Sequence, residues 1–326
     1  MDYVASAMNR LTLYSALIFT ASLAFFALYL LHNIWPETIG GHIDGDTYYA
    51  AGRAVIEGAM DHIYEIGAII PGPECDNWAN TPLYQQYPGI FRDMVRLPGY
   101  VVPYIYPPPW AGIFAVPALL GKAWFHLIWI MVLIGSWIAV IFAGIRSWHW
   151  KLIAVAVLLW FPPFHGSLIS GNITPLLIAL VFLGGPFGVA VAGWAKPWIW
   201  IGTIAMFGRR LIDLIDYERR IDFSFGFITA FLVGLMVSNN NLSLFLAWIK
   251  PLRLMSNAIG GIELHDIWRM SIGAVIALVA VFKLRGRHRL PLLMFGGQLL
   301  SPVWWDHYWC WLIPVLLSFR MNQQST

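Results

Sequence analysis

The chain has 326 residues, of which 59% are hydrophobic and 11% charged, and its formal net charge is +3. Soluble domains carry about 25% charged residues, so this composition argues against a soluble enzyme, a disordered protein and a nucleic-acid-binding protein. Apolar runs of about 20 residues recur along the chain, and a helix of that length crosses a bilayer core of about 30 Å. We therefore expect an all-α polytopic integral membrane protein.

The first predicted span covers residues 11–31, and one long polar loop follows it over residues 36–108. This loop contains nine of the 17 acidic residues and only three of the basic ones. Most other basic residues gather in clusters between apolar segments: Arg146 with Lys151, Arg209 to Arg220, and Lys283 to Arg289. By the positive-inside rule, these clusters face the cytoplasm and the acidic loop is extracytoplasmic.

Proline and glycine divide the later apolar sequence into shorter pieces, at residues 107–109, 162–163, 184–186 and 197. Pieces of about 10–15 residues are too short to cross a bilayer alone. They have to be re-entrant or broken helices, which lipid tolerates only where protein or water satisfies the backbone. We predict about eight to ten transmembrane or re-entrant helices in a single membrane domain over residues 1–326, with residues 36–108 as its extracytoplasmic loop.

Within this loop, residues 46–57 have apolar side chains at helical spacing, and Tyr48, Ala51 and Val55 share one face that Met60 continues. The pattern predicts a short amphipathic helix that lies on the membrane surface. Short helices of this kind are the structure that we expect in the loop as a whole.

Asp44 and Asp46 stand at the start of this predicted helix. Carboxylates there stabilise the positive end of a helix, and such capping is the structural interpretation of the pair. The chemical interpretation is that these carboxylates deprotonate an acceptor hydroxyl at the membrane surface, or that one of them holds a divalent cation.

Further polar groups interrupt the apolar sequence. Tyr106 and Pro107 begin the return from the loop to the membrane, as a rigid corner or as a surface on which a sugar or lipid stacks. Asn172 lies in a break that can also be a turn with a helix cap. Lys196 indicates a functional site with a phosphate partner, unless it snorkels to an interface. His307 can act as a base or orient a carboxylate, or belong to an interfacial turn.

Five short elements occur in a fixed order along the chain: Asp44 with Tyr48-Tyr49, Tyr106-Pro107-Pro108, Gly171-Asn172, Ala195-Lys196-Pro197, and Ser301-Pro302 with Trp305 and His307. In this order they resemble the membrane glycosyltransferases of family 87. These are mannosyltransferases of the GT-C fold that use polyprenol-phosphate-mannose as their donor. The resemblance extends over most of the chain, although each element is short.

The resemblance implies roles for the matched residues. Asp44 is the first choice for the catalytic base and Asp46 the second, with His307 close to that base. Lys196 meets the lipid phosphate. Binding of the donor and substrate falls to seven positions: Tyr48, Tyr49, Tyr106, Pro107, Asn172, Lys196 and Trp305. Beyond the lipid-linked donor no cofactor or metal is required, because polyprenyl phosphate needs less stabilisation as a leaving group than a free alkoxide does.

The function implied is an inverting hexosyl transfer, most simply of mannose, from a polyprenyl-phosphate donor to a lipid, glycan or protein acceptor. The expected location is the bacterial inner membrane, as a multi-pass protein with its active site on the extracytoplasmic side. Its partners are then the donor, a glycan or glycolipid acceptor and membrane lipids, without nucleic acid. Three alternatives stay open: a lipid or sugar transporter, a non-catalytic subunit of a membrane complex, and an enzyme that uses another sugar such as arabinose.

Overall fold

A computed structural model describes residues 2–29, 43–64, 82–97, 100–101, 104–203, 217–249, 264–284, 288–301 and 306–320. Helices make up almost all regular structure in these ranges, and the only strands there are an antiparallel pair, β1 (Val95–Leu97) and β2 (Tyr100–Val101). The helical class predicted from composition is confirmed, and this small hairpin in the first loop is the exception to it.

The first third of the described chain contains one long helix followed by the short elements of the first loop. These elements are α1 (Asp2–Tyr29), α3 (Ile43–Ile56), the 3-10 helix η2 (Met60–His62), α4 (Pro82–Gln86), α5 (Pro88–Met94) and α6 (Pro108–Ala118). The predicted first span, residues 11–31, falls within or next to α1. The described part of residues 36–108 thus contains several short helices.

The remaining elements are one long helix and a series of shorter ones. In chain order they are α7 (Lys122–Gly144), α8 (Trp148–Leu159), α9 (Pro162–Ser170), α10 (Thr174–Leu183), α11 (Gly185–Ala195), η4 (Pro197–Ile201), α13 (Tyr217–Val237), α14 (Leu244–Ala247), α16 (Leu264–Phe282), α17 (Arg289–Leu299), η7 (Asp306–Trp311) and α18 (Leu312–Arg320).

Two of the described helices are long and apolar enough to cross a membrane: α7 and the part of α13 from Arg220 to Val237. The pair α8 and α9 makes a third candidate if its 64° bend belongs to one broken span. Shorter apolar helices cover Thr12–Leu28, Thr174–Leu183 and Tyr308–Ser318. The described residues therefore support a polytopic membrane protein with fewer full-length spans than the eight to ten helices predicted, because several apolar segments are short helices.

Proline accounts for several of the breaks. Pro108, Pro162 and Pro197 each begin a helix, where the missing N–H would have had no partner in any case. Gly171 ends α9 with φ 68°, a left-handed conformation that glycine adopts without steric cost. These breaks place the polar residues between the helices, close to the ends of several of them.

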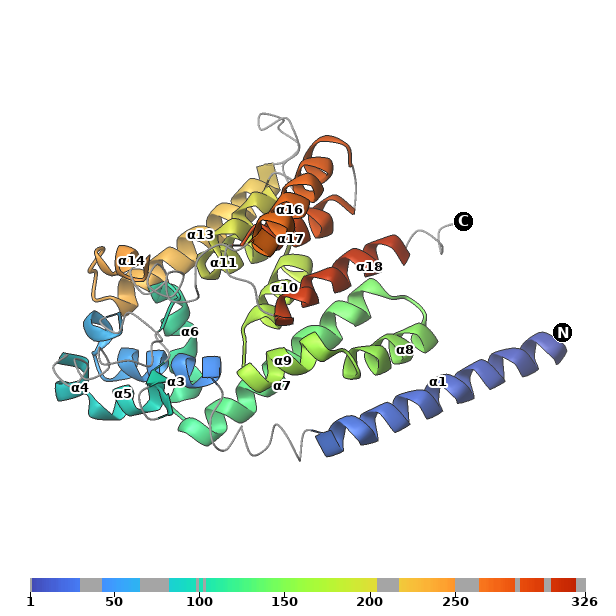
Figure 1. Cartoon of the computed structure of the whole chain (residues 1–326), viewed down its shortest axis with the longest axis horizontal. Helices are drawn as coiled ribbons and strands as arrows, with labels where there is room; N and C mark the ends of the chain where they lie inside the picture. The colour runs from blue at the N-terminus through green and yellow to red at the C-terminus, as the bar shows by residue number, and fades with distance from the viewer. Residues whose placement is uncertain are drawn as a thin grey trace.

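Figure 1 shows how the helices are arranged. The short helices α3 to α6 gather at one end, and the two chain termini lie at the other. Helix α1 packs along α8, α11 packs along α13, and α16 packs along α17. Helix α3 contacts α5, α6, α7 and α9, so it is enclosed by protein.

The enclosure of α3 corrects the prediction of a helix that lies on the membrane surface. Ala50, Ala51 and Ala54 are fully buried, and so is the ring of Tyr48, so both the predicted apolar face and its neighbours are covered. Small side chains allow this close approach, and Gly52 lies directly against the backbone of Phe114 in α6. Helix α3 therefore belongs to the core that positions the candidate site.

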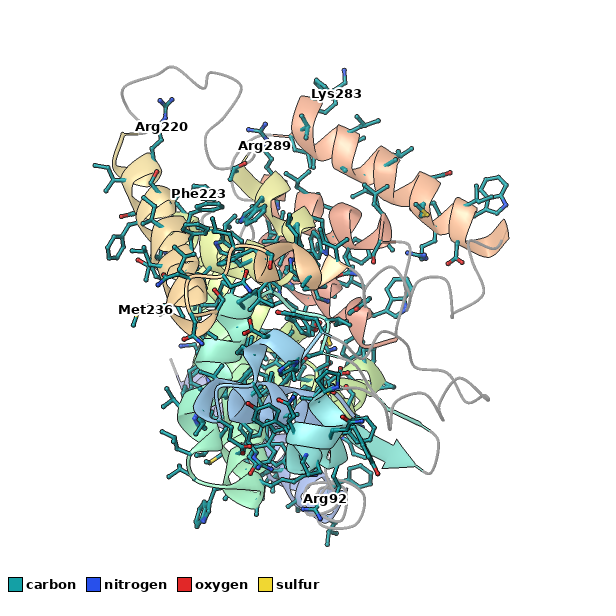
Figure 2. All side chains as sticks on the ribbon, turned by 90° about the vertical axis from the view of Figure 1, so that its left-hand side faces the viewer. Arg92, Arg220, Phe223, Met236, Lys283 and Arg289 are labelled. Carbon is teal, nitrogen blue, oxygen red and sulfur yellow. The ribbon has the colours of Figure 1, made fainter. Side chains whose placement is uncertain are left out.

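Four described basic side chains can be placed from Figure 2. Figure 2 shows Arg220, Lys283 and Arg289 toward one end, and Arg92 of the first loop at the opposite end. This separation is the pattern on which the positive-inside prediction rests. The orientation itself stays a prediction.

Candidate functional site

The first turn of α3 presents two carboxylates in different directions. Asp44 is half-buried, whereas Asp46 is 5% exposed. Successive residues of a helix are about 100° apart, so positions two residues apart point to nearly opposite sides. Each carboxylate accordingly has its own set of partners, and the two sets come from different helices.

Asp44 faces the junction of α9 and α10. The Asn172 side-chain amide donates from Nδ2 to Asp44 Oδ2 over 2.7 Å. Backbone contacts hold this junction: Asn172 N–H donates to Ser167 O over 2.9 Å, and Trp129 Nε1 donates to Gly171 O over 2.7 Å. The left-handed glycine thus turns the chain so that Asn172 points at the first turn of α3.

The carbonyl oxygen of the Asn172 side chain is hydrogen-bonded to Thr174. Asn172 Oδ1 accepts from the Thr174 backbone N–H over 2.9 Å and from the Thr174 hydroxyl over 2.6 Å. Thr174 is fully buried at the start of α10, and Asn172 is 5% exposed. Asparagine often bonds the backbone two residues onward in this way, and here the bond also fixes the side chain in one orientation.

Lys196 completes this group from the end of α11. Its Nζ donates to Thr174 Oγ1 over 3.4 Å, and it lies 3.9 Å from the centre of the Tyr308 ring in η7. Only 9% of Lys196 is exposed. Among the described residues, Thr174 is its one hydrogen-bond partner, although an ammonium group has three N–H donors. A buried ammonium with unused donors is suited to binding an anion.

Buried tyrosines line the same side of α3. The Tyr48 hydroxyl donates to the Tyr106 hydroxyl over 3.1 Å and accepts from the backbone N–H of Ile173 over 3.4 Å. Tyr64 donates to Tyr106 O over 2.7 Å, which fixes the segment that enters α6. The Tyr48 ring also stacks on Phe114, with the ring centres 4.6 Å apart. These contacts place Tyr106 and the following Pro107 beside the Asn172 junction.

The electrostatics of Asp44 suit a proton acceptor. Burial raises the pKa of its carboxyl from 3.8 to about 6, although the hydrogen bond from Asn172 and the charge of Lys196 act in the opposite direction. The carboxyl is therefore ionised at neutral pH, yet more basic than an ordinary aspartate. A general base works best when its pKa lies close to the working pH.

Asp46 has different surroundings. Its Oδ1 lies 2.9 Å from Nε2 of His126 and 3.0 Å from Nζ of Lys122, both in the first turns of α7. His126 is fully buried. The neighbouring Tyr49 lies on this side too, with its ring against Phe125 and His126. Asp46 and Tyr49 thus belong to the contact between α3 and α7.

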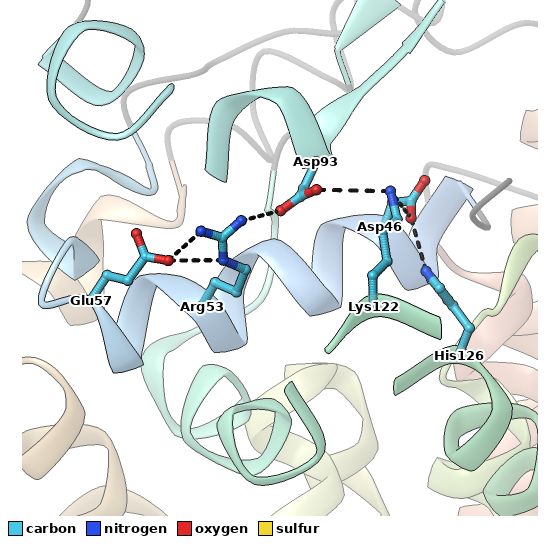
Figure 3. A network of polar contacts seen from close by, with 6 residues as sticks. All are labelled: Asp46, Arg53, Glu57, Asp93, Lys122 and His126. Atoms are coloured by element: carbon cyan, nitrogen blue, oxygen red, sulfur yellow. Dashed lines mark hydrogen bonds and ion pairs between the residues drawn. The ribbon is translucent and has the colours of Figure 1, made fainter. Parts of the chain in front are cut away.

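Figure 3 shows that these ion pairs continue along α3. The Asp93 carboxylate of α5 accepts a hydrogen bond from Arg53 Nη1 over 2.8 Å, and its other oxygen lies 3.9 Å from Lys122 Nζ. Arg53 also donates from Nε to Glu57 over 2.8 Å. The network joins α3, α5 and α7, and no three acidic, histidine or cysteine side chains among the described residues come together as a metal site.

The structure brings together most of the residues singled out in the sequence. Asp44, Tyr48, Tyr106, Asn172 and Lys196 surround one junction, and Pro107 adjoins it. Two of the predicted residues lie elsewhere, Asp46 and Tyr49, because the helix turns them toward α7. Trp305 and the side chain of His307 lie outside the described residues.

Sequence reasoning did not assign a role to Thr174, Tyr308, Lys122 or His126. Thr174 and Tyr308 stand inside the polar breaks that were recognised, so their position next to Asn172 and His307 was the available signal. Lys122 and His126 begin a long apolar helix four residues apart, a spacing that places them on one face.

Comparison with known proteins yields no relatives. No family model matches the chain, and neither a curated protein nor a solved structure matches it.

Proposed function

We propose that this protein is a membrane glycosyltransferase that moves a sugar from a polyprenyl-phosphate donor to a hydroxyl acceptor at the extracytoplasmic face. One observation supports this above all: a half-buried carboxylate, Asp44, and a buried ammonium group, Lys196, lie at two ends of one group of side chains. A proton acceptor and an anion-binding cation are the two groups that transfer from a phosphate donor needs.

The reaction that fits this pair is a single displacement. The acceptor oxygen attacks the anomeric carbon while the bond from that carbon to the phosphate oxygen breaks, and the acceptor proton passes to Asp44. Polyprenyl phosphate leaves with the bonding electrons, and attack from the opposite side inverts the anomeric centre. Mannose is the sugar that the family resemblance implies, and the GT-C fold is part of the same proposal.

Lys196 supports the leaving-group side of this proposal. Charged side chains in the apolar part of a membrane protein are costly and mark functional sites. The ammonium is held over the Tyr308 ring and by one long hydrogen bond to Thr174. Its remaining donors are suited to the oxygens of a phosphate, whose charge grows as the sugar leaves.

The test is a transfer assay on the purified full chain in lipid nanodiscs. Radiolabelled polyprenyl-phosphate-mannose is the donor, and a lipid and glycan extract of the source membranes supplies acceptors. We expect label in the acceptor fraction, transfer lowered by about 100-fold or more with Asp44→Asn, and unchanged transfer with Asp61→Asn. Asp61 is an exposed acid of the same loop and serves as the matched control. Label transfer that persists in Asp44→Asn contradicts the proposal.

A transporter is the second candidate, because of the 64° bend between α8 and α9. Broken helices around a buried charged pair are also found in carriers of ions and lipids. The same nanodisc protein distinguishes the two, since a carrier leaves the donor intact. Uptake of the donor into proteoliposomes without release of polyprenyl phosphate favours the transporter.

A further inference from the structure

The contacts between Lys196 and Asp44 form a chain of hydrogen bonds with a fixed direction. Lys196 donates to Thr174, the Thr174 hydroxyl donates to Asn172, and the Asn172 amide donates to Asp44. With Lys196 protonated and Asp44 ionised, the ammonium group only donates and the carboxylate only accepts, so in this charge state neither end can be reversed. Each intermediate side chain therefore has to accept on the lysine side and donate on the aspartate side.

Their partners fix the orientation of the two side chains in the middle of this series of hydrogen bonds, Thr174 and Asn172. Oδ1 of Asn172 faces two donors of Thr174, its N–H and its hydroxyl, so the amide nitrogen has to face Asp44. Thr174 is fully buried, so no solvent can replace its hydroxyl in this role. Hydrogen bonds in series polarise one another, most strongly where water is excluded.

We propose that Thr174 is a positioning residue that links the two ends of the site: its hydroxyl aligns Asn172, and through it Asp44, with the phosphate-binding ammonium of Lys196. The inference rests on the proposed function for the identity of the anion, a lipid phosphate. The inference adds a coupling between the phosphate-binding group, Lys196, and the carboxylate, Asp44. Binding of the phosphate changes the charge at Lys196, and the hydrogen-bonded chain transmits that change to the carboxylate.

The sign of the coupling follows from the charges. Lys196 lowers the pKa of Asp44, which burial has raised to about 6. A phosphate at Lys196 cancels that positive charge, so the pKa of Asp44 rises further and the donor-bound protein contains the stronger base. The other groups that interact with Asp44 are phenols, neutral at this pH: Tyr48, Tyr106 and Tyr308. The charged groups on the facing helices pair with Asp46 or with one another: Lys122, His126, Arg53, Asp93 and Glu57.

Two substitutions isolate the hydroxyl. Thr174→Val keeps the shape of the side chain and removes the donor, whereas Thr174→Ser keeps the donor and is the matched control. The full chain in nanodiscs is titrated by infrared difference spectroscopy, with Asp44→Asn as the blank, so that the signal belongs to the Asp44 carboxyl. Each titration is run without ligand, with farnesyl monophosphate, and with inorganic phosphate at the same concentration.

We expect farnesyl monophosphate to move the titration midpoint upward by about half a pH unit or more in the wild type and in Thr174→Ser. In Thr174→Val the shift falls to less than half of that value. An equal shift in Thr174→Val, or no shift in the wild type, overturns the coupling. An equal response to inorganic phosphate overturns the preference for a lipid phosphate. Thr174→Ala takes the place of the valine variant if the latter does not fold.

This readout does not require sugar transfer. A protein that shows the shift but transfers no sugar contradicts the proposed function and leaves the coupling intact. A protein that transfers sugar without the shift contradicts the coupling alone.

Discussion

Asp44 and Asp46 lie two residues apart in one helical turn, and their surroundings differ in every respect. Asp46 pairs with His126 and Lys122 at 2.9 and 3.0 Å, inside a network that continues to α5. Asp44 accepts one side-chain hydrogen bond among the described residues, from Asn172, a neutral amide. Asp46 contacts two basic side chains directly, whereas Asp44 is joined to a basic group, Lys196, only through two neutral side chains.

The two acids show that direct contact with basic side chains distinguishes a carboxylate with a structural role from one that is suited to catalysis. Direct contacts with Lys122 and His126 give Asp46 a role in joining two helices. A carboxylate whose burial raises its pKa to about 6 changes its charge near neutral pH. Asp46 therefore fastens α3 to α7, whereas Asp44 faces the junction at Asn172.

The largest effect that we expect separates the two acids by activity. Asp44→Asn removes the proton acceptor and lowers sugar transfer by about 10²- to 10⁴-fold, the usual contribution of general base catalysis. Asp46→Asn, measured on protein shown to be folded, keeps most of the transfer rate. An equal loss of transfer in both folded variants would mean that the two acids do not differ in function.

The next effect concerns the cation. Lys196→Met removes the group that binds the phosphate, so the affinity for farnesyl monophosphate falls by about 10- to 150-fold, which corresponds to a charged hydrogen bond of about 1.5–3 kcal/mol. Isothermal titration calorimetry in nanodiscs measures it. Lys283→Met is the control, because Lys283 is exposed and follows α16, an element that contributes none of the described residues bonded to Asp44. Unchanged affinity in Lys196→Met would remove the lysine from the site.

We expect the free energy of unfolding to depend more on Asp46 than on Asp44. Asp46→Asn leaves buried His126 without its carboxylate, and we expect the free energy of unfolding to fall by about 1.5–3 kcal/mol. Chemical denaturation in detergent, followed by tryptophan fluorescence, measures the change. Asp44→Asn should lower stability less than Asp46→Asn does, and a larger loss in Asp44→Asn would reverse the roles.

The pH dependence involves Asp44 and Lys196. Burial lowers the pKa of Lys196 to about 7, so this lysine gains charge as the pH falls below 7. With its pKa raised to about 6, the Asp44 carboxylate becomes mostly protonated between pH 7 and 5, so the base is lost and the transfer rate falls by about five- to tenfold over that range. Stability changes in the opposite direction. Because the folded pKa lies above the unfolded value, this group contributes most below pH 3.8 and loses that contribution as the pH rises through 6. A transfer rate that stays level from pH 7 to 5 would contradict the assignment.

The smallest effect is at the edge of the ion-pair network. Glu57 pairs with Arg53 where both side chains are partly exposed. Water screens such pairs, so Glu57→Gln should lower the free energy of unfolding by less than about 1 kcal/mol. The same denaturation experiment checks it, and a loss as large as that of Asp46→Asn would show that the network acts as a single unit.

The sequence predicted the parts of the site better than their arrangement. Asn172 and Lys196 were recognisable because they are polar residues in apolar surroundings, where each needs a partner. The different surroundings of Asp44 and Asp46 were not predictable, because they depend on how α3 is rotated about its axis. A helix that is buried on several faces shows no polar side from which that rotation can be read.

The fold was predictable to a similar extent. The helical class and the proline breaks follow from composition and from the chemistry of proline, and both are present in the described residues. The hairpin β1–β2 is a local pairing of Val95 with Val101 and of Leu97 with Tyr100, which the sequence analysis did not predict. The enclosure of α3 depends on contacts between distant segments, such as Gly52 against Phe114. Such contacts leave no periodic pattern in the sequence.

The most direct test of Asp44 as the base uses an acceptor that needs no base. Azide is already an anion, so it can attack the anomeric carbon without giving up a proton. We predict that Asp44→Ala in nanodiscs loses transfer to hydroxyl acceptors but forms the inverted glycosyl azide from polyprenyl-phosphate-mannose, detected by mass spectrometry and NMR. If Asp44→Ala consumes no donor with azide, or still transfers to hydroxyl acceptors at the wild-type rate, Asp44 is not the base.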